Sequence, residues 1–411
     1  MIATKELFAA ALPIDDNWHI KDVEFEESGE GEKPELHIYI GFNRGTRFHC
    51  PEEGCATEAT AYDTDERTWR HLDFFQYKTY LHAPLPRVKC GEHKVKTVHV
   101  PWARPGSGFT LLFEAFVLEL CRHLPVDRIA DMVGEHDTRL WGFILKYVEA
   151  AREELDFTAL AALGVDETSR KGHSYLTLFA DLASRNVLFV TEGKDHTTVD
   201  RFVDDLKAHG GCPARVRLAT CDMSPAFKKG MRERMPAAKR VIDKFHVIKH
   251  ANEAVDKVRR AEAKDNPLLK KTKYLWLTND GNLTDKQRAR KEALSRKRLK
   301  TGRAYEMRVT LQGIYAEAAT QAEAEAALKK LCSWMMRSRL EPMKDLAKTL
   351  RNNMDEILNY FDNRVTNAIL EGINSVVQNV KRRARGYRNN EYFKAMIYLN
   401  CSGLDLSVVP G

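Results

Sequence analysis

The sequence predicts a multidomain α/β protein in which small N-terminal modules precede a larger domain built on a mixed β-sheet. Three observations support this prediction. Residues 1–105 hold cysteine and histidine pairs at short spacing among strands and turns. Residues 106–155 have the apolar periodicity of helices, and residues 156–265 alternate strand and helix patterns. The chain of 411 residues is also too long for one ordinary domain.

Residues 1–105 are predicted to form an N-terminal domain of short strands and turns. The segment ELHIYIGF (35–42) alternates like a strand. The segments RVKC (87–90) and KVKTVHV (94–100) predict a hairpin whose turn is GEH.

Two pairs of potential metal ligands lie at turns of this domain. One pair is separated by four residues and the other by two, so each can close a knuckle around a tetrahedral ion. The predicted ligands of one structural Zn²⁺ are Cys50, Cys55, Cys90 and His93. The alternative is that these four residues are unrelated to one another. Three other histidines could also be ligands, but none of them completes so short a pair: His49, His71 and His82.

Residues 106–155 predict three helices. The segment FTLLFEAFVLELCRHL is amphipathic, and PVDRIADMVG is a short helix that Pro125 begins and Gly134 ends. Asp137 or Thr138 caps the third helix. A short helix, a tight turn and a longer helix are typical of a helix-turn-helix that reads DNA, and a plain three-helix bundle is the alternative.

Residues 156–265 predict three antiparallel strands followed by alternating helices and strands, in the order β-β-β-α-β-α-β-α. This is the ribonuclease-H-like arrangement, with a mixed sheet between helices. Residues 266–350 have little strand pattern and predict a helical insertion. Residues 351–403 then supply the final helices of the domain and a basic tail.

Three carboxylates are candidates for a metal-dependent active site. Asp166 lies in the first of these strands, and Asp222 ends the fourth, which neighbours the first in such a sheet. Two facing carboxylates repel unless a cation lies between them, and Mg²⁺ or Mn²⁺ suits such ligands. Glu371 is the predicted third ligand, from a helix with an apolar face and a polar face. Two such ions can activate a nucleophile and stabilise the leaving oxygen of a phosphodiester. The alternative to an active site is that the three acidic residues occur at these positions by chance.

Other polar residues could support this site. Asn374 shares the polar face of the helix with Glu371. Asp181 ends the second strand, and Asp243 precedes His246 by three residues. Asp243 and His246 could instead anchor the turn from strand to helix.

The formal net charge is +7, and the basic residues are clustered. Residues 286–303 hold nine basic residues and one acid, and residues 381–388 hold five and no acid. Such stripes suit a polyanion such as nucleic acid, although each could be a solvated helix face. The predicted contacts to DNA phosphates are Lys381, Arg382, Arg383, Arg385 and Arg388.

Several classes of protein are excluded by pattern. No apolar run reaches the roughly 18 residues of a membrane span. The N-terminus lacks the basic start and long apolar core of a signal peptide, which predicts a cytoplasmic protein. No GxxxxGK[ST] phosphate loop is present, which predicts a reaction without ATP.

Three segments of the chain resemble the DDE transposases of bacterial insertion sequences, specifically the ISL-three family. They are GVDETSRKGHSYLTLFADL (164–182), LATCDMSPAFKKGMRERMPAAKRVIDKFHVIKHANEAVDKVRR (218–260) and LEGINSVVQNVKRRARGYRN (370–389). The most specific parts are the D-x-F-H-V string at Asp243 and the end of the third segment, from Glu371 onward. The resemblance covers roughly residues 45–400 and implies a zinc finger, a helix-turn-helix and a ribonuclease-H-like catalytic domain with a helical insertion. It implies that Asp166, Asp222 and Glu371 are the catalytic triad, and that the insertion explains the 148 residues between the last two.

The expected function is therefore DNA transposition. The enzyme would bind the terminal inverted repeats of its element, cleave the element ends, and join the 3′-hydroxyl ends to target DNA. Both ends must be handled together, so at least a homodimer in a synaptic complex is expected. The alternatives are a DNA-binding regulator without catalysis, a ribonuclease-H-like structure-specific nuclease, and a zinc scaffold protein.

Overall fold

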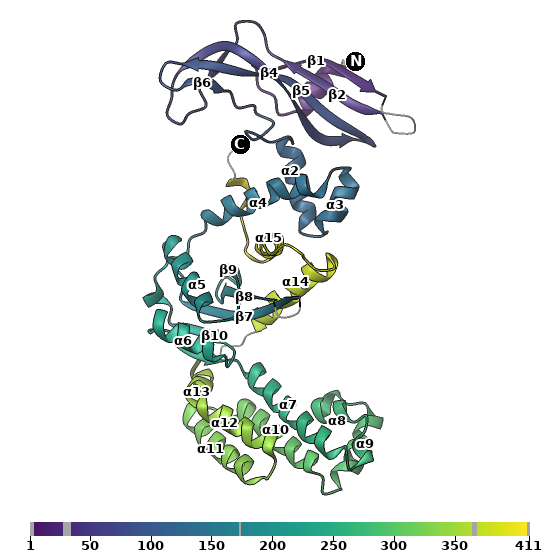
Figure 1. Cartoon of the computed structure of the whole chain (residues 1–411), viewed down its shortest axis with the longest axis vertical. Coiled ribbons are helices and arrows are strands. Elements are labelled where there is room, and N and C mark those ends of the chain that lie inside the picture. The colour runs from purple at the N-terminus through teal and green to yellow at the C-terminus, as the bar shows by residue number, and fades with distance from the viewer. Residues whose placement is uncertain (1–3, 28–33, 172–173, 364–367, 409–411) are drawn as a thin grey trace. The chain divides into compact units, whose positions relative to one another are not determined.

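A computed structural model of the chain describes residues 4–27, 34–171, 174–363 and 368–408 (Figure 1). The chain divides into two compact units. The first unit contains residues 1–154 and 380–411, and the second contains residues 155–379. Within the described ranges, no helix has the length and apolarity needed to cross a membrane.

Six strands form the sheet of the first unit: β1 (His19–Glu26), β2 (Glu35–Gly41), β3 (Arg47–His49), β4 (Glu58–Phe74), β5 (Tyr77–Cys90) and β6 (Lys94–Thr97). Their order is β1-β2-β5-β4-β3, and β6 pairs with β5. Alternate residues of β2 and β5 enter the core, among them Leu36, Ile38 and Leu81. The predicted hairpin around GEH is confirmed, because Cys90 of β5 pairs with Lys94 of β6.

Two features of this sheet differ from the sequence expectation of short strands and turns. β4 has 17 residues and β5 has 14. Most of β4 is exposed or half-exposed on both faces, so no clean alternation of apolar residues marks it. A helix, α1 (Thr4–Ala11), also precedes β1 and packs against it.

Three helices follow the sheet in the first unit: α2 (Leu111–Cys121), α3 (Val126–Val133) and α4 (Asp137–Glu153). Pro125 precedes α3 as predicted, and Gly134 ends α3 with a left-handed φ of 65° that glycine adopts without strain. The predicted cap of α4 is wrong by one or two residues. His136 is the cap, because its Nδ1 accepts the N–H of Thr138.

The last helix of the chain, α15 (Asn390–Cys401), packs against α4 within the same unit. The rings of Trp141 and Tyr392 stack with their centroids 4.0 Å apart. The guanidinium of Arg152 lies over the ring of Tyr398. The C-terminal helix therefore completes the hydrophobic core of the three-helix module.

Five strands form the sheet of the second unit: β7 (Ala162–Lys171), β8 (Ser174–Asp181), β9 (Val187–Glu192), β10 (Leu218–Cys221) and β11 (Lys239–Ile242). Their order is β11-β10-β7-β8-β9. The first three strands are antiparallel, whereas β10 is parallel to β7 and to β11. The helices that alternate with the later strands are α5 (Thr197–Ala208), α6 (Pro225–Arg234) and α7 (Lys244–Glu262). The predicted ribonuclease-H-like order is confirmed.

The two faces of β7 have different partners. Leu163 and Val165 enter the core that includes Phe202 of α5. The opposite face contacts α14 (Ala368–Arg383) through Leu370, Asn374 and Gln378. A Cβ added at Gly164 would lie 2.9 Å from the side chain of Leu370, so glycine permits the close approach of α14 to the strand.

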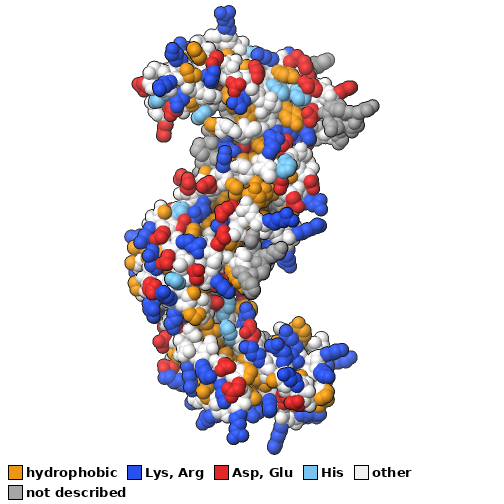
Figure 2. All heavy atoms as spheres, viewed as in Figure 1, with side chains coloured by type: hydrophobic (Ala, Val, Ile, Leu, Met, Phe, Trp, Pro, Cys, Tyr) orange, Lys and Arg blue, Asp and Glu red, His pale blue; other side chains and the backbone are white. Residues whose placement is uncertain are grey.

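A helical region lies between the sheet and α14 in sequence, as predicted. α7 runs from the sheet into its core, which contains Met307, Leu311 and Leu328. The side-chain amide of Asn359, in the last helix of this region, donates a hydrogen bond of 2.8 Å to the carbonyl of Arg240 in β11. Lys and Arg side chains gather on the surface of this region (Figure 2). Its helices after α7 are α8 (Lys273–Leu277), α9 (Asp285–Ser295), α10 (Lys300–Glu317), α11 (Gln321–Arg337), α12 (Glu341–Asn352) and α13 (Met354–Asn363).

Candidate active site and metal centre

Two side-chain hydrogen bonds join α14 to β7. The side-chain amide of Asn374 donates to Oδ2 of Asp166. One turn further on, Nε2 of Gln378 donates to Oγ1 of Thr168 at 2.8 Å. Four helical residues advance about 6 Å and two strand residues about 6.6 Å, so the two elements stay in step. The helix and the strand together hold the Asp166 carboxylate in one orientation.

Asp222 directly follows the last residue of β10, the strand beside β7. β10 pairs with β7 in a register that sets Thr220 opposite Gly164, and each aspartate follows two residues later. The N–H of Ser224 donates to Oδ1 of Asp222 at 2.8 Å, which orients the second carboxylate. Both aspartates are half-buried. Two fixed carboxylates side by side form a donor set that suits a hard divalent cation.

Negative charge is concentrated at this place. Burial raises the pKa of Asp166, and the nearby Asp222 adds to the increase, whereas the N–H of Glu167, the imidazole of His246 and the amide of Asn374 lower it. Burial, followed by the charge of Asp222, raises the pKa of Glu167 to about 7. A cation between the aspartates would offset this repulsion, so the two carboxylates fit one part of a metal site. Among the described residues, no third carboxylate, imidazole or thiol converges on them.

Glu371 lies apart from this cluster. It occupies the first turn of α14, one turn before Asn374, and its side chain is exposed. Among the residues that the structure describes, Glu371 makes no hydrogen bond or ion pair with Asp166 or Asp222. The structure thus brings together Asp166, Asp222, His246 and Asn374, and leaves Glu371 open to solvent on the same helix as Asn374.

Asp181 and Asp243 occupy different surroundings. Asp181 pairs with Leu163, three residues before Asp166, and accepts the N–H groups of Ala183 and Ser184 at 3.0 Å. Its carboxylate therefore stabilises the turn after β8. Asp243 is buried where β11 gives way to α7, three residues before His246.

The four predicted zinc ligands converge in the first unit. Their ligand atoms all lie within 4.8 Å of one another. Sγ of Cys55 is 3.7 Å from Sγ of Cys90, and Nδ1 of His93 is 3.5 Å from Sγ of Cys90 and 3.8 Å from Sγ of Cys50. A tetrahedral zinc site with ordinary bond lengths has edges of about 3.8 Å between sulfurs and about 3.6 Å between sulfur and nitrogen. The cluster therefore has the size that Zn²⁺ requires.

Two of the four predicted ligands are shifted toward the thiolate form that zinc binds, whereas the pKa of Cys50 and that of His93 are raised. The backbone N–H groups of His93 and Glu92 lower the pKa of the Cys90 thiol to about 6, so that it is largely thiolate at neutral pH. The side chain and N–H of Thr57 lower the pKa of Cys55. The rival histidines have other partners: His49 with Glu58, His71 with Thr110, and His82 with Thr68.

The three-helix module presents polar side chains on the outer face of α4. Thr138, Arg139, Gly142 and Lys146 are exposed along one stripe, while Trp141, Phe143 and Ile144 are buried. This stripe has the position that a DNA-reading helix requires.

The predicted basic residues lie at the end of α14 and in the loop that follows. Nη1 of Arg383 donates to the carbonyls of Arg122 and His123, so this guanidinium caps the C-terminus of α2. The side chains of Arg382, Arg385 and Arg388 are exposed, and that of Lys381 is half-buried.

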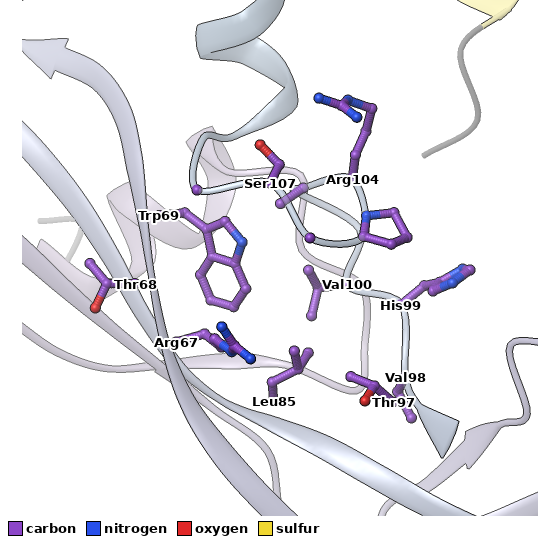
Figure 3. A pocket seen from close by; sticks show the side chains of 14 residues that line it. Arg67, Thr68, Trp69, Leu85, Thr97, Val98, His99, Val100, Arg104 and Ser107 are labelled. Carbon is purple, nitrogen blue, oxygen red and sulfur yellow. The ribbon is translucent and has the colours of Figure 1, made fainter. Parts of the chain in front are cut away.

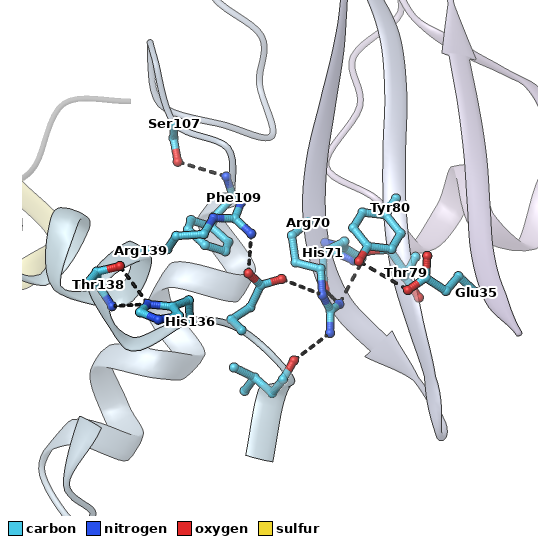
Figure 4. A network of polar contacts seen from close by, with 12 residues as sticks. Glu35, Arg70, His71, Thr79, Tyr80, Ser107, Phe109, His136, Thr138 and Arg139 are labelled. Atoms are coloured by element: carbon cyan, nitrogen blue, oxygen red, sulfur yellow. Dashed lines mark hydrogen bonds and ion pairs between the residues drawn. The ribbon is translucent and has the colours of Figure 1, made fainter. Parts of the chain in front are cut away.

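Arg70 was missed by the sequence analysis, because a charged residue in a polar strand gives no signal of burial. It is 1% exposed and joins the sheet to the helices of the first unit (Figure 4). Its Nη2 donates to the carbonyl of Val133 at 3.1 Å, and its Nε lies 3.5 Å from Oε1 of Glu135. Glu135 also pairs with Arg139 of α4. Arg70 thereby fixes the turn between α3 and α4.

A pocket of about 440 Å³ lies beside this junction in the first unit (Figure 3). Arg67 and His99 are exposed at its rim, and Trp69 is buried in its wall. Arg104 also lines it, but its guanidinium is held by both oxygens of the buried Glu114 at 2.7 and 2.8 Å.

Comparison with known proteins gives three family matches in chain order. Residues 46–93 match the zinc-finger of transposase IS204/IS1001/IS1096/IS1165, residues 98–148 match the helix-turn-helix domain of transposase family ISL3, and residues 163–397 match the ISL3 transposase model. The chain is 27% identical over 435 residues to a transposase for insertion sequence element IS1557 of Mycobacterium tuberculosis, which covers 97% of this chain and 95% of the relative. It is 27% identical over 346 residues to a transposase for insertion sequence element IS1001 of Bordetella parapertussis, with 81% and 84% covered.

Proposed function

The chain belongs to the ISL3 family of DDE transposases, and on this premise we propose that Asp166, Asp222 and Glu371 form its catalytic site. The observation that carries the proposal is the register of β10 against β7, because Asp166 and Asp222 each follow the Gly164–Thr220 pair by two residues. In the proposed reaction, a water hydrolyses one phosphodiester at each element end and frees a 3′-hydroxyl. That hydroxyl then attacks target DNA, and its oxygen replaces the leaving 3′-oxygen.

Asp166 and Asp222 would hold two Mg²⁺ or Mn²⁺ ions, with Glu371 as the third ligand. Such ions, when bound, activate the attacking oxygen and stabilise the leaving one. The protein's own contribution is orientation: Asn374 holds Asp166 by its amide and Ser224 holds Asp222 by its N–H. Glu371 is accessible to ligands because it is exposed, and it lies one turn before Asn374 on the same helix.

His246 has a supporting role in this proposal. Its imidazole lies near enough to Asp166 to lower the pKa of that carboxyl, against the effect of burial. It would help to keep Asp166 ionised before metal binds. Asp181 and Asp243 would maintain the framework around the site, because one supports a turn and the other is buried at the start of α7.

The N-terminal modules would select the DNA. The helix-turn-helix binds DNA, and we propose that the exposed stripe of α4 reads the terminal inverted repeats in the major groove. One structural Zn²⁺ on the Cys50 cluster would hold the ribbon folded. The basic residues at the end of α14 would contact backbone phosphates: Lys381, Arg382, Arg383, Arg385 and Arg388. Arg383 also has a structural role, because it caps the C-terminus of α2.

Further parts of the proposal concern assembly and conditions. Both ends of the element must be processed together, so the active form would be a homodimer or a larger synaptic assembly. The reaction would need no ATP, and it would take place in the bacterial cytoplasm on nucleoid DNA. We propose the same domain limits as the sequence suggests, at residues 105, 155, 265, 350 and 403.

The test uses the gene with its native flanking DNA on a plasmid. Purified protein and Mg²⁺ are added, alongside Glu371→Gln, and new 3′ ends are mapped. Discrete cuts at a pair of inverted repeats that Glu371→Gln abolishes are the expected result. Binding at the repeats without cutting by either protein would favour a regulator, and cuts that follow DNA structure would favour a nuclease.

A further inference from the structure

The outer end of the helical region is strongly basic. We define the insertion tip as residues 264–300, which contain the short helix η2 (Pro267–Leu269), α8 and α9. The exposed cations of the tip are Lys264, Lys270, Lys271, Lys273, Lys286, Arg288, Arg290, Arg296, Lys297, Arg298 and Lys300. Its exposed acids are Asp265, Asp280, Asp285 and Glu292.

Much of the acidic charge of the tip is already neutralised. Asp280 pairs with the buried Lys291, and Asp285 lies 3.5 Å from Arg288. Among the described residues, no ion pair is recorded for Lys270, Lys271 or Lys273. The like charges of such a surface repel one another, and a polyanion relieves the repulsion.

Cations from two parts of the tip, the segment before α8 and the helix α9, lie close together. Nη2 of Arg290 in α9 lies 3.5 Å from the carbonyl of Lys270, and α8 packs against α9. Tyr274 stands among these cations with 69% of its surface exposed, and Nζ of Lys273 lies 5.7 Å from its ring centroid. Aromatic rings left exposed among cations are typical of nucleic-acid-binding surfaces.

α7 fixes the distance between the tip and the active site. Its first turn carries His246, which lies near Asp166, and its last residue, Glu262, lies just before the tip. Its 19 residues span about 28 Å, because an α-helix rises 1.5 Å per residue. A duplex that runs parallel to α7 would advance about 3.4 Å per base pair, so this length would correspond to about eight base pairs.

We propose that the insertion tip is a second DNA-binding surface, which grips the phosphate backbone of the duplex about eight base pairs from the cleaved phosphodiester. The inference rests on the proposed active site at Asp166 and Asp222 and adds a contact to it. The tip anchors the duplex on one side of the cut, and the bond to be cleaved is held at the other end of α7.

The test compares two triple variants of the full-length protein. Lys270, Lys271 and Lys273 are changed together to Gln. In the matched control, Lys329, Lys344 and Lys348 of α11 and α12 are changed to Gln, because each of them is ion-paired within its own helix. The DNA is a duplex of the element end with its native flank. The readouts are the salt dependence of binding, a hydroxyl-radical footprint and the melting temperature.

If three phosphate contacts are lost, the slope of log affinity against log salt falls in magnitude by about 2 to 3 units. Protection about eight base pairs from the cut should disappear in the tip variant, with the melting temperature unchanged and the control like wild type. The inference is overturned if wild type binds and cuts this DNA but the tip variant keeps its slope and footprint. It is also overturned if the control changes equally. Wild type that binds without cutting would instead contradict the proposed active site.

Discussion

The side chain of Asn374 donates a hydrogen bond to the carboxylate of Asp166, although 208 residues separate them in the sequence. This bond joins the helix after the insertion to the first strand of the sheet. The exposed Glu371 lies on the same helix, so the bond also sets the distance between two candidate ligands. The helix that follows the long insertion therefore contacts the strand that carries Asp166.

Asn374→Ala should lower cleavage by about 10- to 100-fold, the usual cost of losing a residue that orients a metal ligand. The Mg²⁺ concentration for half-maximal rate should rise, because Asp166 is no longer held. The matched control is Gln378→Ala, which removes the hydrogen bond to Thr168 one turn away. Equal losses in both variants would show that the bond only supports the fold.

Glu167→Gln should stabilise the metal-free protein at high pH. Burial raises the pKa of Glu167 to about 7, so the folded state binds a proton that the unfolded state releases above pH 4.5. The contribution of this group to stability falls as pH rises from about 4.5 to 7 and stays low above that. We expect the substitution to raise stability at pH 8 by about 1 kcal/mol after solvent screening, or about 2–4 °C, with no gain at pH 4.5. A gain of equal size at both pH values would contradict the assigned ionisation.

Cys90→Ser should remove the zinc and with it the binding of repeat DNA. The Cys90 thiolate is one of four ligands, and a structural site that loses one ligand no longer stabilises its fold. Zinc content should fall from one ion per chain to nearly none, while the second unit keeps its thermal transition. Cys212→Ser, at an exposed cysteine, is the control and should keep its zinc. Full zinc content in Cys90→Ser would refute the ligand set.

Arg70→Met should destabilise the first unit by about 3 kcal/mol, because it removes a buried cation that pairs with Asp73 and Glu135 and donates to the carbonyl of Val133. DNA binding should weaken as well, since Glu135 sits at the turn before α4. Arg67→Met, on the same strand but exposed, is the matched control. Denaturant unfolding measures both variants. A loss below 0.5 kcal/mol, comparable with ordinary surface changes, would exclude the anchoring role of Arg70.

Much of this organisation could be predicted from local patterns. The strand order of the second unit follows from apolar runs with clear turns between them, such as the meander that carries Asp166. The zinc cluster follows from ligand spacing, because knuckle geometry is local. The position of Asp222 near Asp166 could be predicted because the first and fourth strands are neighbours in a ribonuclease-H-like sheet.

The features that were not predicted depend on tertiary contacts. The length of β4 is hidden because charges occupy both of its faces. Burial of Arg70 requires the helices that cover it, and the cap at His136 depends on a ring nitrogen rather than on the usual carboxylate or hydroxyl. Arg383 caps the C-terminus of α2, from which it is separated by about 260 residues in sequence, so no local pattern predicts the contact.

The central claim is that Asp166 and Asp222 bind a divalent metal together, and metal rescue tests it most directly. Cleavage is measured for Asp222→Cys and Asp222→Ala with Mg²⁺ and with Mn²⁺. A thiolate binds Mg²⁺ poorly and accepts softer ions, so Asp222→Cys should be inactive with Mg²⁺ and regain cutting with Mn²⁺, whereas Asp222→Ala should stay inactive with both. Full activity of Asp222→Cys with Mg²⁺, or an equal response of the two variants to Mn²⁺, would contradict metal binding by Asp222.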